Sequence, residues 1–271
     1  MTDLMLATAP AGVLLEDRGR TATVDALGMP YRALNEVLYD LAERGVEHIH
    51  LRGVTGQRYI GTNLRHALRL TIEGVPGQDL GAFMDGPYIE LTGDAQDGCG
   101  NTMNSGTIVI NGSAGDILGH SMRGGEIFVR HNVGYRVGIH MKEYGDGPWG
   151  GTGKPVIVIG GTAQHFLGEY MAGGVLILLG AQLAQGIRHP SHQVGTGMHG
   201  GAIYVRGAVR EEFLGREVGL APLKPEDEAL VARYVARYAE VFAVDAQSLL
   251  DRPFIKLAPL TKRPYGRLYA Y

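Results

Sequence analysis

Glycines in the stretch GSAGDILGHSMRGGEIFVR, residues 112–130, have a spacing close to that of loops that bind phosphate groups. Gly112, Gly115 and Gly119 would let backbone amides approach a pyrophosphate, as glycines do in dinucleotide-binding loops. The same pattern returns six times in register along the chain. An enzyme needs one phosphate site and not six, so we interpret these glycines as architecture and predict no cofactor-binding residue.

Three histidines have a spacing that metal ligands also show. His189 and His192 are three residues apart and His199 follows them. No cysteine accompanies them, and the segment has no HExxH signature. A loop that carries histidines explains the pattern better, so we predict no metal site.

Ser121 and Cys99 are the candidates for nucleophilic catalysis. Ser121 lies in GHSMRG, without the G-x-S-x-G elbow of serine hydrolases. Cys99 takes a position that leucine or valine fills in other repeats, which indicates a small buried side chain rather than a reactive thiolate. His120 and His140 are expected to lie close together, either as a functional pair or as stacked surface histidines. We predict no catalytic residue, and a hydrolase that uses Ser121 or a histidine pair stays a minor alternative.

A 19-residue repeat underlies the glycine pattern. Six of the nine methionines fall on this series, which two insertions interrupt, and a glycine stands three residues before each of them. We predict a structural role for these twelve residues. The methionines are Met84, Met103, Met122, Met141, Met171 and Met198, and the glycines are Gly81, Gly100, Gly119, Gly138, Gly168 and Gly195.

Two apolar columns, two residues apart, follow each methionine, as a strand with one buried face requires. Short strands of this kind cannot bury their apolar face alone, so neighbouring units must stack, and parallel strands favour right-handed connections. The sequence therefore predicts an all-β solenoid, a right-handed parallel β-helix of about seven coils. The first column is Ile89, Ile108, Ile127, Ile157, Leu176 and Ile203, and the second is Leu91, Ile110, Val129, Ile159, Leu178 and Val205.

Helices are predicted on both sides of the β-helix, which spans residues 51–207. In residues 1–50, the segment YRALNEVLYDLAERG has apolar residues at helical spacing and ends at a glycine, so we expect an N-terminal helical cap. In residues 208–271, Pro225 begins PEDEALVARYVARYAEVF with an acidic first turn, as a helix start prefers. The last segment, DRPFIKLAPLTKRPYGRLYAY, is predicted to be an extended arm without regular structure, which lies on the protein or on a partner.

The two insertions are candidate contact surfaces, because insertions in a solenoid form loops on its flank. The first surplus, in KEYGDGPWGGTGK, contains Trp149, and the second, in AQLAQGIRHPSHQ, contains His189 and His192. We predict these loops, at 142–154 and 181–193, as candidate interfaces. A solvated loop without function is the open alternative for each.

Composition limits the class of protein. The chain has 271 residues, a net charge of −3 and 45% hydrophobic residues, as ordinary soluble proteins do. No basic stripe interleaved with aromatics predicts nucleic-acid binding, and no apolar stretch approaches the ~18 residues of a membrane span. The first residues lack the basic region of a secretion signal. The single cysteine cannot form an internal disulfide or an iron–sulfur set, so we expect a cytoplasmic protein.

Long strings resemble the GXGXG β-helix family, which forms the last domain of the large chain of glutamate synthases. The chain looks most like the free-standing domain 3 subunit of archaeal-type split glutamate synthases, and it is similar to the β-helix subunit of formylmethanofuran dehydrogenase and its formyltransferase/hydrolase relatives. The strings cover most of the chain: YRALNEVL, GQRYIG, GVPGQDLGAFMDGP, GDAQDGCGNTMNSGTIVING, SMRGGEIFVRHNVGYRVGIHMKEY, VIVIGGTAQHFLGEYMAGG and VGTGMHGGAIYVRG.

The resemblance implies a non-catalytic subunit of a glutamate-synthase-like complex. Such a subunit holds a glutamine amidotransferase-like and an FMN-binding synthase-like partner in fixed relation. FMN and iron–sulfur clusters are then expected on the partners, with no cofactor on this chain, and the isolated chain can form homo-oligomers. The alternative is a β-helix subunit of a formylmethanofuran dehydrogenase or formyltransferase/hydrolase complex of one-carbon metabolism.

Overall fold

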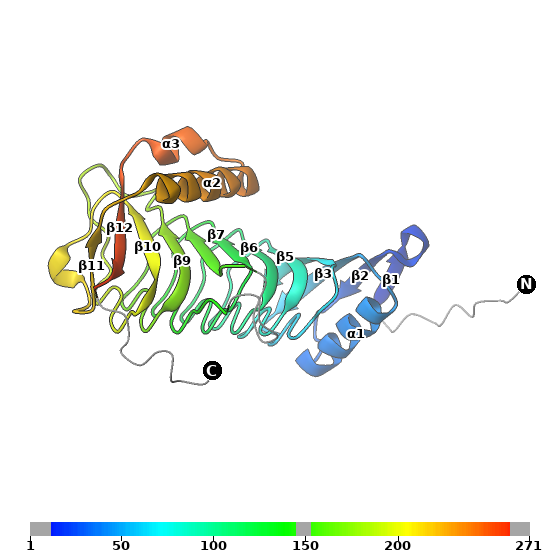
Figure 1. Ribbon diagram of the computed structural model, residues 1–271. Helices are drawn as coiled ribbons and strands as arrows, with labels where there is room; N and C mark the ends of the chain where they lie inside the picture. The colour runs from blue at the N-terminus through cyan, green and yellow to red at the C-terminus, as the bar shows by residue number, and fades with distance from the viewer. Residues whose placement is uncertain (1–11, 145–152, 261–271) are drawn as a thin grey trace, which may run out of the picture.

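The computed structural model describes residues 12–144 and 153–260. Within these ranges the chain forms a 12-stranded, mostly parallel sheet that is not closed into a barrel, with few helices (Figure 1). The predicted β-rich architecture is confirmed. The strands are β1 (Val13–Glu16), β2 (Thr21–Asp25), β3 (His48–Thr55), β4 (Arg69–Val75), β5 (Asp85–Leu91), β6 (Ser105–Ile110), β7 (Glu126–Val129), β8 (Val156–Ile159), β9 (Ala172–Leu178), β10 (Gly200–Arg206), β11 (Val218–Ala221) and β12 (Phe254–Pro259).

In the part of the chain that the structure describes, three α-helices and two short 3-10 turns accompany the sheet. The helices are α1 (Tyr31–Glu43), α2 (Pro225–Phe242) and α3 (Ala246–Leu250), and the 3-10 turns are η1 (Asp17–Gly19) and η2 (Glu211–Phe213). Figure 1 shows α1 near the N-terminal end of the row of strands and α2 and α3 over the C-terminal half. Both long helices lie where the apolar spacing and the proline start predict them. None of the described helices is long and apolar enough to cross a membrane.

The strands from β2 to β10 pair in parallel, in chain order, and the two predicted apolar columns are in register. Ile108 pairs with Ile127, for example, and Ile127 pairs with Ile157. Because side chains alternate between the faces of a strand, both columns face the same interior. The 19-residue spacing therefore sets the register of the sheet.

A second line of contacts runs through the segments that follow the strands. Ala95, Ala114, Val133 and Ala163 form successive parallel bridges. At the next turn, the amide of each repeat glycine donates to a carbonyl one repeat earlier, as Gly119 does to Cys99 at 2.8 Å. The repeats are thus tied together along the segments between the strands as well as through the sheet.

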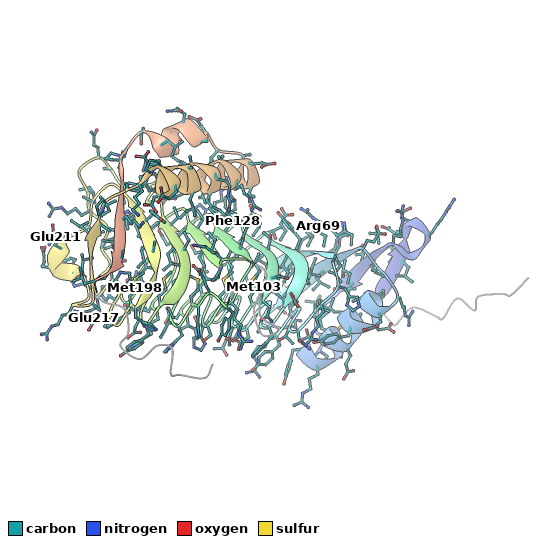
Figure 2. The ribbon with its side chains drawn as sticks, in the orientation of Figure 1. Arg69, Met103, Phe128, Met198, Glu211 and Glu217 are labelled. Atoms are coloured by element: carbon teal, nitrogen blue, oxygen red, sulfur yellow. The ribbon has the colours of Figure 1, made fainter. Side chains whose placement is uncertain are left out.

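The sheet has two apolar cores, one on each face. The inner core contains both columns and the repeat methionines. The outer core joins Phe128, Val158 and Ile177 to the apolar side of α2, with Tyr234 and Tyr238. Figure 2 places Phe128 toward α2 and Met103 and Met198 away from it. Strand β8 is consequently buried at every residue.

Both ends of the parallel stack carry antiparallel strands that the sequence analysis did not predict. The expected irregular arm is wrong for residues 254–259, because β12 pairs with β10 and with β11. Residues 261–271 of the predicted arm lie outside the described residues. In residues 1–50, β1 and β2 form a hairpin ahead of the expected helix. Unpaired strand edges promote aggregation, and these added strands reduce that exposure.

Candidate functional site

In each repeat, the chain turns at three residues whose backbone has the left-handed conformation. The middle one of the three is the repeat glycine. Around Gly138 they are Arg136 at φ 56°, Gly138 at 71° and His140 at 56°. The flanking side chains Arg136 and His140 are exposed, whereas a Cβ on Gly138 would lie 3.0 Å from Leu176 in the core. Only the middle position therefore requires glycine for space as well as for backbone conformation.

The structure gathers the twelve predicted structural residues at the inner core. The six repeat glycines have φ between 66° and 71°, and the six methionines are 0–1% exposed. A flexible thioether side chain fills such a stack without a strict shape. The residues of the repeated motif are thus used for turning and packing the chain.

Aromatic and histidine rings form two rows along the outside of these turns. His120 contacts His140 with ring centroids 6.0 Å apart, and His140 stacks on Tyr170 at 5.4 Å. This confirms the predicted proximity of His120 and His140. We call the two rows the corner rows: they are His120, His140 and Tyr170, and Tyr135, His165, His192 and Phe213. Tyr135 and Tyr170 are 41% and 46% exposed, so the rows present rings to the surface.

The candidate nucleophiles have no catalytic surroundings. Ser121 makes no side-chain hydrogen bond to a histidine or a carboxylate among the described residues. Cys99 is a free, fully buried thiol; burial raises its pKa, and Asp79 adds to that effect. Half-burial, together with His140, lowers the pKa of His120. Among the described residues, Ser121 thus has no base that would activate it, and Cys99 stays a neutral thiol.

The three histidines of the predicted loop have separate environments. His189 is buried, and its Nε2 lies 3.2 Å from the Arg206 carbonyl oxygen. Burial lowers the pKa of His189 to about 4. His192 is exposed and stacks on Phe213 at 3.6 Å, and His199 Nδ1 lies 3.1 Å from the carbonyl of Gly197. In the part of the chain that the structure describes, no group of three potential ligands could hold a metal ion.

The loop at 181–193 is held to the sheet by buried polar side chains. Besides His189, Ser191 is buried and donates its Oγ–H to the Ala163 carbonyl at 2.6 Å. The side chain of His189 is therefore part of the interior and offers no surface of its own to a partner, whereas His192 belongs to a corner row. Trp149, the third predicted interface residue, lies outside the described residues.

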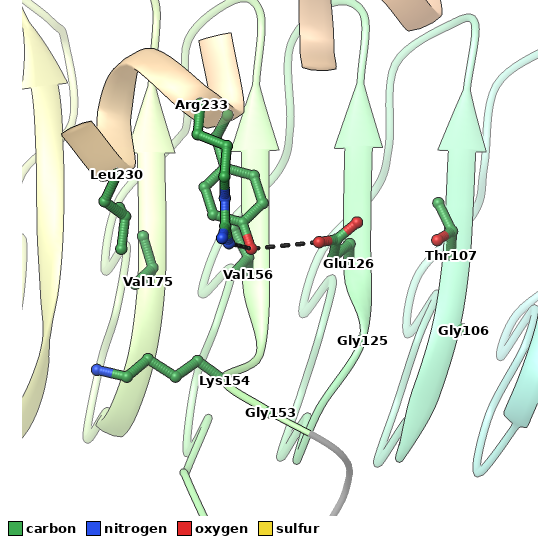
Figure 3. A pocket seen from close by; sticks show the side chains of 11 residues that line it. Gly106, Thr107, Gly125, Glu126, Gly153, Lys154, Val156, Val175, Leu230 and Arg233 are labelled. Atoms are coloured by element: carbon green, nitrogen blue, oxygen red, sulfur yellow. Dashed lines mark hydrogen bonds between the residues drawn. The ribbon is translucent and has the colours of Figure 1, made fainter. Parts of the chain in front are cut away.

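A cavity of about 470 Å³ lies between α2 and the sheet and contains acidic, basic and phenolic groups (Figure 3). Arg233 donates to the Tyr234 hydroxyl at 2.8 Å, and that hydroxyl donates to Glu126 at 3.2 Å. Arg237 also pairs with Glu126. Because these groups bind one another across the boundary between helix and sheet, the network fastens α2 to the sheet.

Asp227 forms a second attachment of α2. It accepts hydrogen bonds from Tyr204 on β10 at 2.5 Å and from Lys256 on β12 at 2.7 Å. Burial alone would raise the pKa of Asp227, but these bonds outweigh it and lower the pKa to about 2. The acidic first turn predicted the helix start, but no sequence pattern indicated these distant partners.

A buried arginine was also missed by sequence reasoning. Arg206 ends β10 and is 5% exposed, and it pairs with Asp251 at 2.5 Å. Its position at the end of an apolar run, in the string YVRG, is the one signal the sequence offers. Its partners come from segments that have no repeat register.

A model of the GXGXG motif family matches residues 43–259, which is most of the chain. The chain belongs to the GXGXG motif family. The match includes every repeat glycine and methionine described above. Family membership therefore rests on the same residues that build the turns and the inner core.

Two further likenesses cover nearly all of this GXGXG chain. An uncharacterized protein of Methanocaldococcus jannaschii is 46% identical over 257 residues, with 91% of this chain and 95% of that protein covered. A chain in the X-ray crystal structure of the formyltransferase/hydrolase complex from Methylorubrum extorquens, in complex with methylofuran, is 20% identical with a TM-score of 0.58. That likeness covers 89% of this chain and 92% of the other, and at this identity it concerns the fold alone.

Proposed function

We propose that this GXGXG chain is a non-catalytic structural subunit of a glutamate-synthase-like complex. In this role it holds a glutamine amidotransferase-like and an FMN-binding synthase-like subunit in fixed relation. The observation that carries the proposal is the use of the repeated motif for turns and packing, as in Gly100 and Met103. The residue strings shared with that branch of the family support the choice of complex.

We propose further that the repeats wind as a right-handed parallel β-helix. The support is twofold: the strands pair in parallel in chain order, and the segments between them form the bridges Ala95–Ala114, Ala114–Val133 and Val133–Ala163. A continuous coil gives each repeat two neighbours at every turn, and such a solenoid is stiff along its length. Stiffness is the property that a spacer between two enzymes needs.

The second candidate is a subunit of a formyltransferase/hydrolase-type complex of one-carbon metabolism. The fold likeness to a chain of the Methylorubrum extorquens complex favours it, because both chains are covered almost completely. A fold of this kind serves either complex equally well. The choice between the two therefore depends on the partners.

In either complex, we expect the cofactors to be bound by the partner subunits and none to be bound by this chain. We expect the complex to lie in the cytoplasm. FMN and iron–sulfur clusters belong to the first candidate. We assign the contact with partners to the corner rows, because exposed aromatic rings on a rigid surface are typical of interfaces. His192, predicted from the sequence as an interface residue, lies in one of these rows.

Affinity isolation of the tagged chain from its native cell extract tests the proposal. The isolated complex is identified by mass spectrometry and by its absorbance spectrum. Glutaminase-like and yellow FMN-binding subunits support the leading candidate, whereas amidohydrolase-like or molybdenum-containing or tungsten-containing partners support the second. A chain that is recovered alone, or that turns over glutamine by itself, contradicts a structural role.

Two surface variants test the assigned contact. Tyr135→Ser with Tyr170→Ser removes exposed rings from both corner rows and is expected to reduce partner recovery at least tenfold. Leu220→Ser is the matched control, because Leu220 is 51% exposed on β11, outside the rows. Equal recovery of partners with both variants would show that the partners bind to another surface of the chain.

A further inference from the structure

A cavity of about 380 Å³ lies between the loop at 181–193, the end of β10 and the segment before β12. Three arginines line it: Arg188 from the loop, Arg206 from β10 and Arg252 from the segment before β12. No acidic side chain is among its described lining residues. Its volume is at the lower end of the range for small-ligand sites.

Arg206, which lines this cavity, has one donor that no described residue uses. Its side chain is 4% exposed. Its Nη2 donates to Asp251 Oδ1 at 2.5 Å and to the Ser248 carbonyl at 3.0 Å, and Nη1 lies 3.4 Å from the Leu179 carbonyl. The buried Nε has no acceptor among the described residues. A buried charged donor without a partner is costly, and an acceptor in the cavity would remove that cost.

The positive charge of the cavity is incompletely balanced. Asp251, which is 54% exposed, pairs with Arg206 and lies 4.0 Å from Arg252 Nε. Arg252 donates in addition to the Leu183 carbonyl at 3.0 Å. Arg188 is exposed and has no hydrogen bond or ion pair to any described residue. Within the described residues, one carboxylate thus serves two of the three guanidinium groups, and Arg188 has none.

Arg188 also lines a second cavity, which adjoins the first. The same loop residues, Gly186, Ile187 and Arg188, line a neighbouring cavity of about 550 Å³ together with His192 and Arg210. A ligand that engages Arg188 would therefore contact the loop that carries His192. Binding in the arginine cavity would hold this loop against β10.

We propose that the arginine cavity, lined by Arg188, Arg206 and Arg252, binds a small oxyanion of the carboxylate or phosphate class. Guanidinium groups present planar pairs of N–H donors that match both kinds of anion. Arg206 supplies the buried donor, Arg252 a second charge, and Arg188 closes on the ligand from the loop. The site does not depend on which complex the chain joins.

Titration of the purified chain by NMR tests the site, with the Nε–Hε signal of Arg206 as the readout. Inorganic phosphate and glutarate are the probes, each at constant ionic strength against sodium chloride. The signal is assigned by its loss in Arg206→Lys and, should that variant not fold, by correlation to the assigned backbone of β10. We expect a saturable shift of this signal with one or both probes.

Two variants separate a site from general attraction to positive charge. Arg188→Ala is expected to weaken binding at least tenfold. Arg216→Ala removes the same charge from an exposed position that does not line the cavity, and it is expected to change the affinity less than twofold. Saturation by glutarate alone or by phosphate alone supports the site and identifies the ligand class. A shift that does not saturate, or equal weakening by both variants, overturns the proposal.

Discussion

A side chain at Gly100 would begin 2.5 Å from the Cδ1 atom of Ile127, which belongs to the following repeat. Real Cβ atoms do not approach a neighbour so closely, so one of the two residues would have to move. The Ile127 side chain is fully buried and pairs with Ile108 and Ile157. Five of the six repeat glycines thus leave room for the column residue of a later repeat, and Gly195 leaves room for Val218 on β11. The two patterns in the sequence therefore depend on each other.

Replacement of Gly100 by alanine is expected to destabilise the chain by about 3 kcal/mol, because a left-handed backbone and an overpacked core both oppose the methyl group. Urea unfolding followed by circular dichroism measures the loss. Gly56→Ala is the matched control, since Gly56 also has a positive φ, of 84°, but an added Cβ would meet nothing within 4 Å. We expect it to cost about 1 kcal/mol. Equal losses would show that contact with Ile127 has no part in the effect.

The repeat made most of the sheet predictable from sequence. Columns such as Ile108, Ile127 and Ile157 mark strands and their register at once, because parallel stacking places equivalent residues beside each other. The terminal strands β1 and β12 have no such columns. They pair through their backbones at the ends of the stack, and short apolar runs such as FIKLAP do not distinguish a strand from an irregular arm.

The candidate sites were less predictable, because their residues meet across long distances in sequence. Arg206 and Asp251 are 45 residues apart, and Tyr204 and Asp227 are 23 apart. No local motif or repeat position links such pairs. The corner rows could be predicted in part, since His120 and His140 occupy nearby positions in adjacent repeats. The contact of His192 with Phe213 could not be predicted, because it joins the second insertion to η2.

Cys99 is expected to be unreactive in the folded chain. Its thiol is fully buried, and burial raises its pKa, so the thiolate that reacts with disulfide reagents is not formed. Labelling with a chromogenic disulfide in buffer is expected to modify no thiol within an hour, and one thiol per chain in denaturing urea. Gln164→Cys adds a thiol at an exposed position and serves as the positive control. Rapid labelling of the wild-type chain in buffer would contradict the buried position of Cys99.

Asp227 is expected to make the chain less stable in acid. Its pKa is about 2 in the folded chain, below the ordinary value of 3.8, so the unfolded chain binds more protons between these values. The stabilisation, about 2 kcal/mol, is complete above pH 4 and is lost as the pH falls toward 2. Urea unfolding at several pH values measures it. Asp227→Asn should flatten this part of the profile, whereas Glu226→Gln, at an exposed neighbour, should leave it unchanged.

His189 is expected to make the free energy of unfolding depend on pH in a second, separate range. Burial lowers its pKa to about 4, while an unfolded histidine titrates near 6.5, so the unfolded chain binds the extra proton between these values. Stability from the neutral ring is therefore present above about pH 6.5 and decreases by about 3 kcal/mol as the pH falls to 4. Urea unfolding between pH 4 and 7.5 measures this slope. His189→Gln should remove the larger part of this slope, because the pKa of His120 is also lowered. His192→Gln, whose side chain is exposed in the same loop, should retain the slope. Persistence of the slope in His189→Gln would assign it to another group.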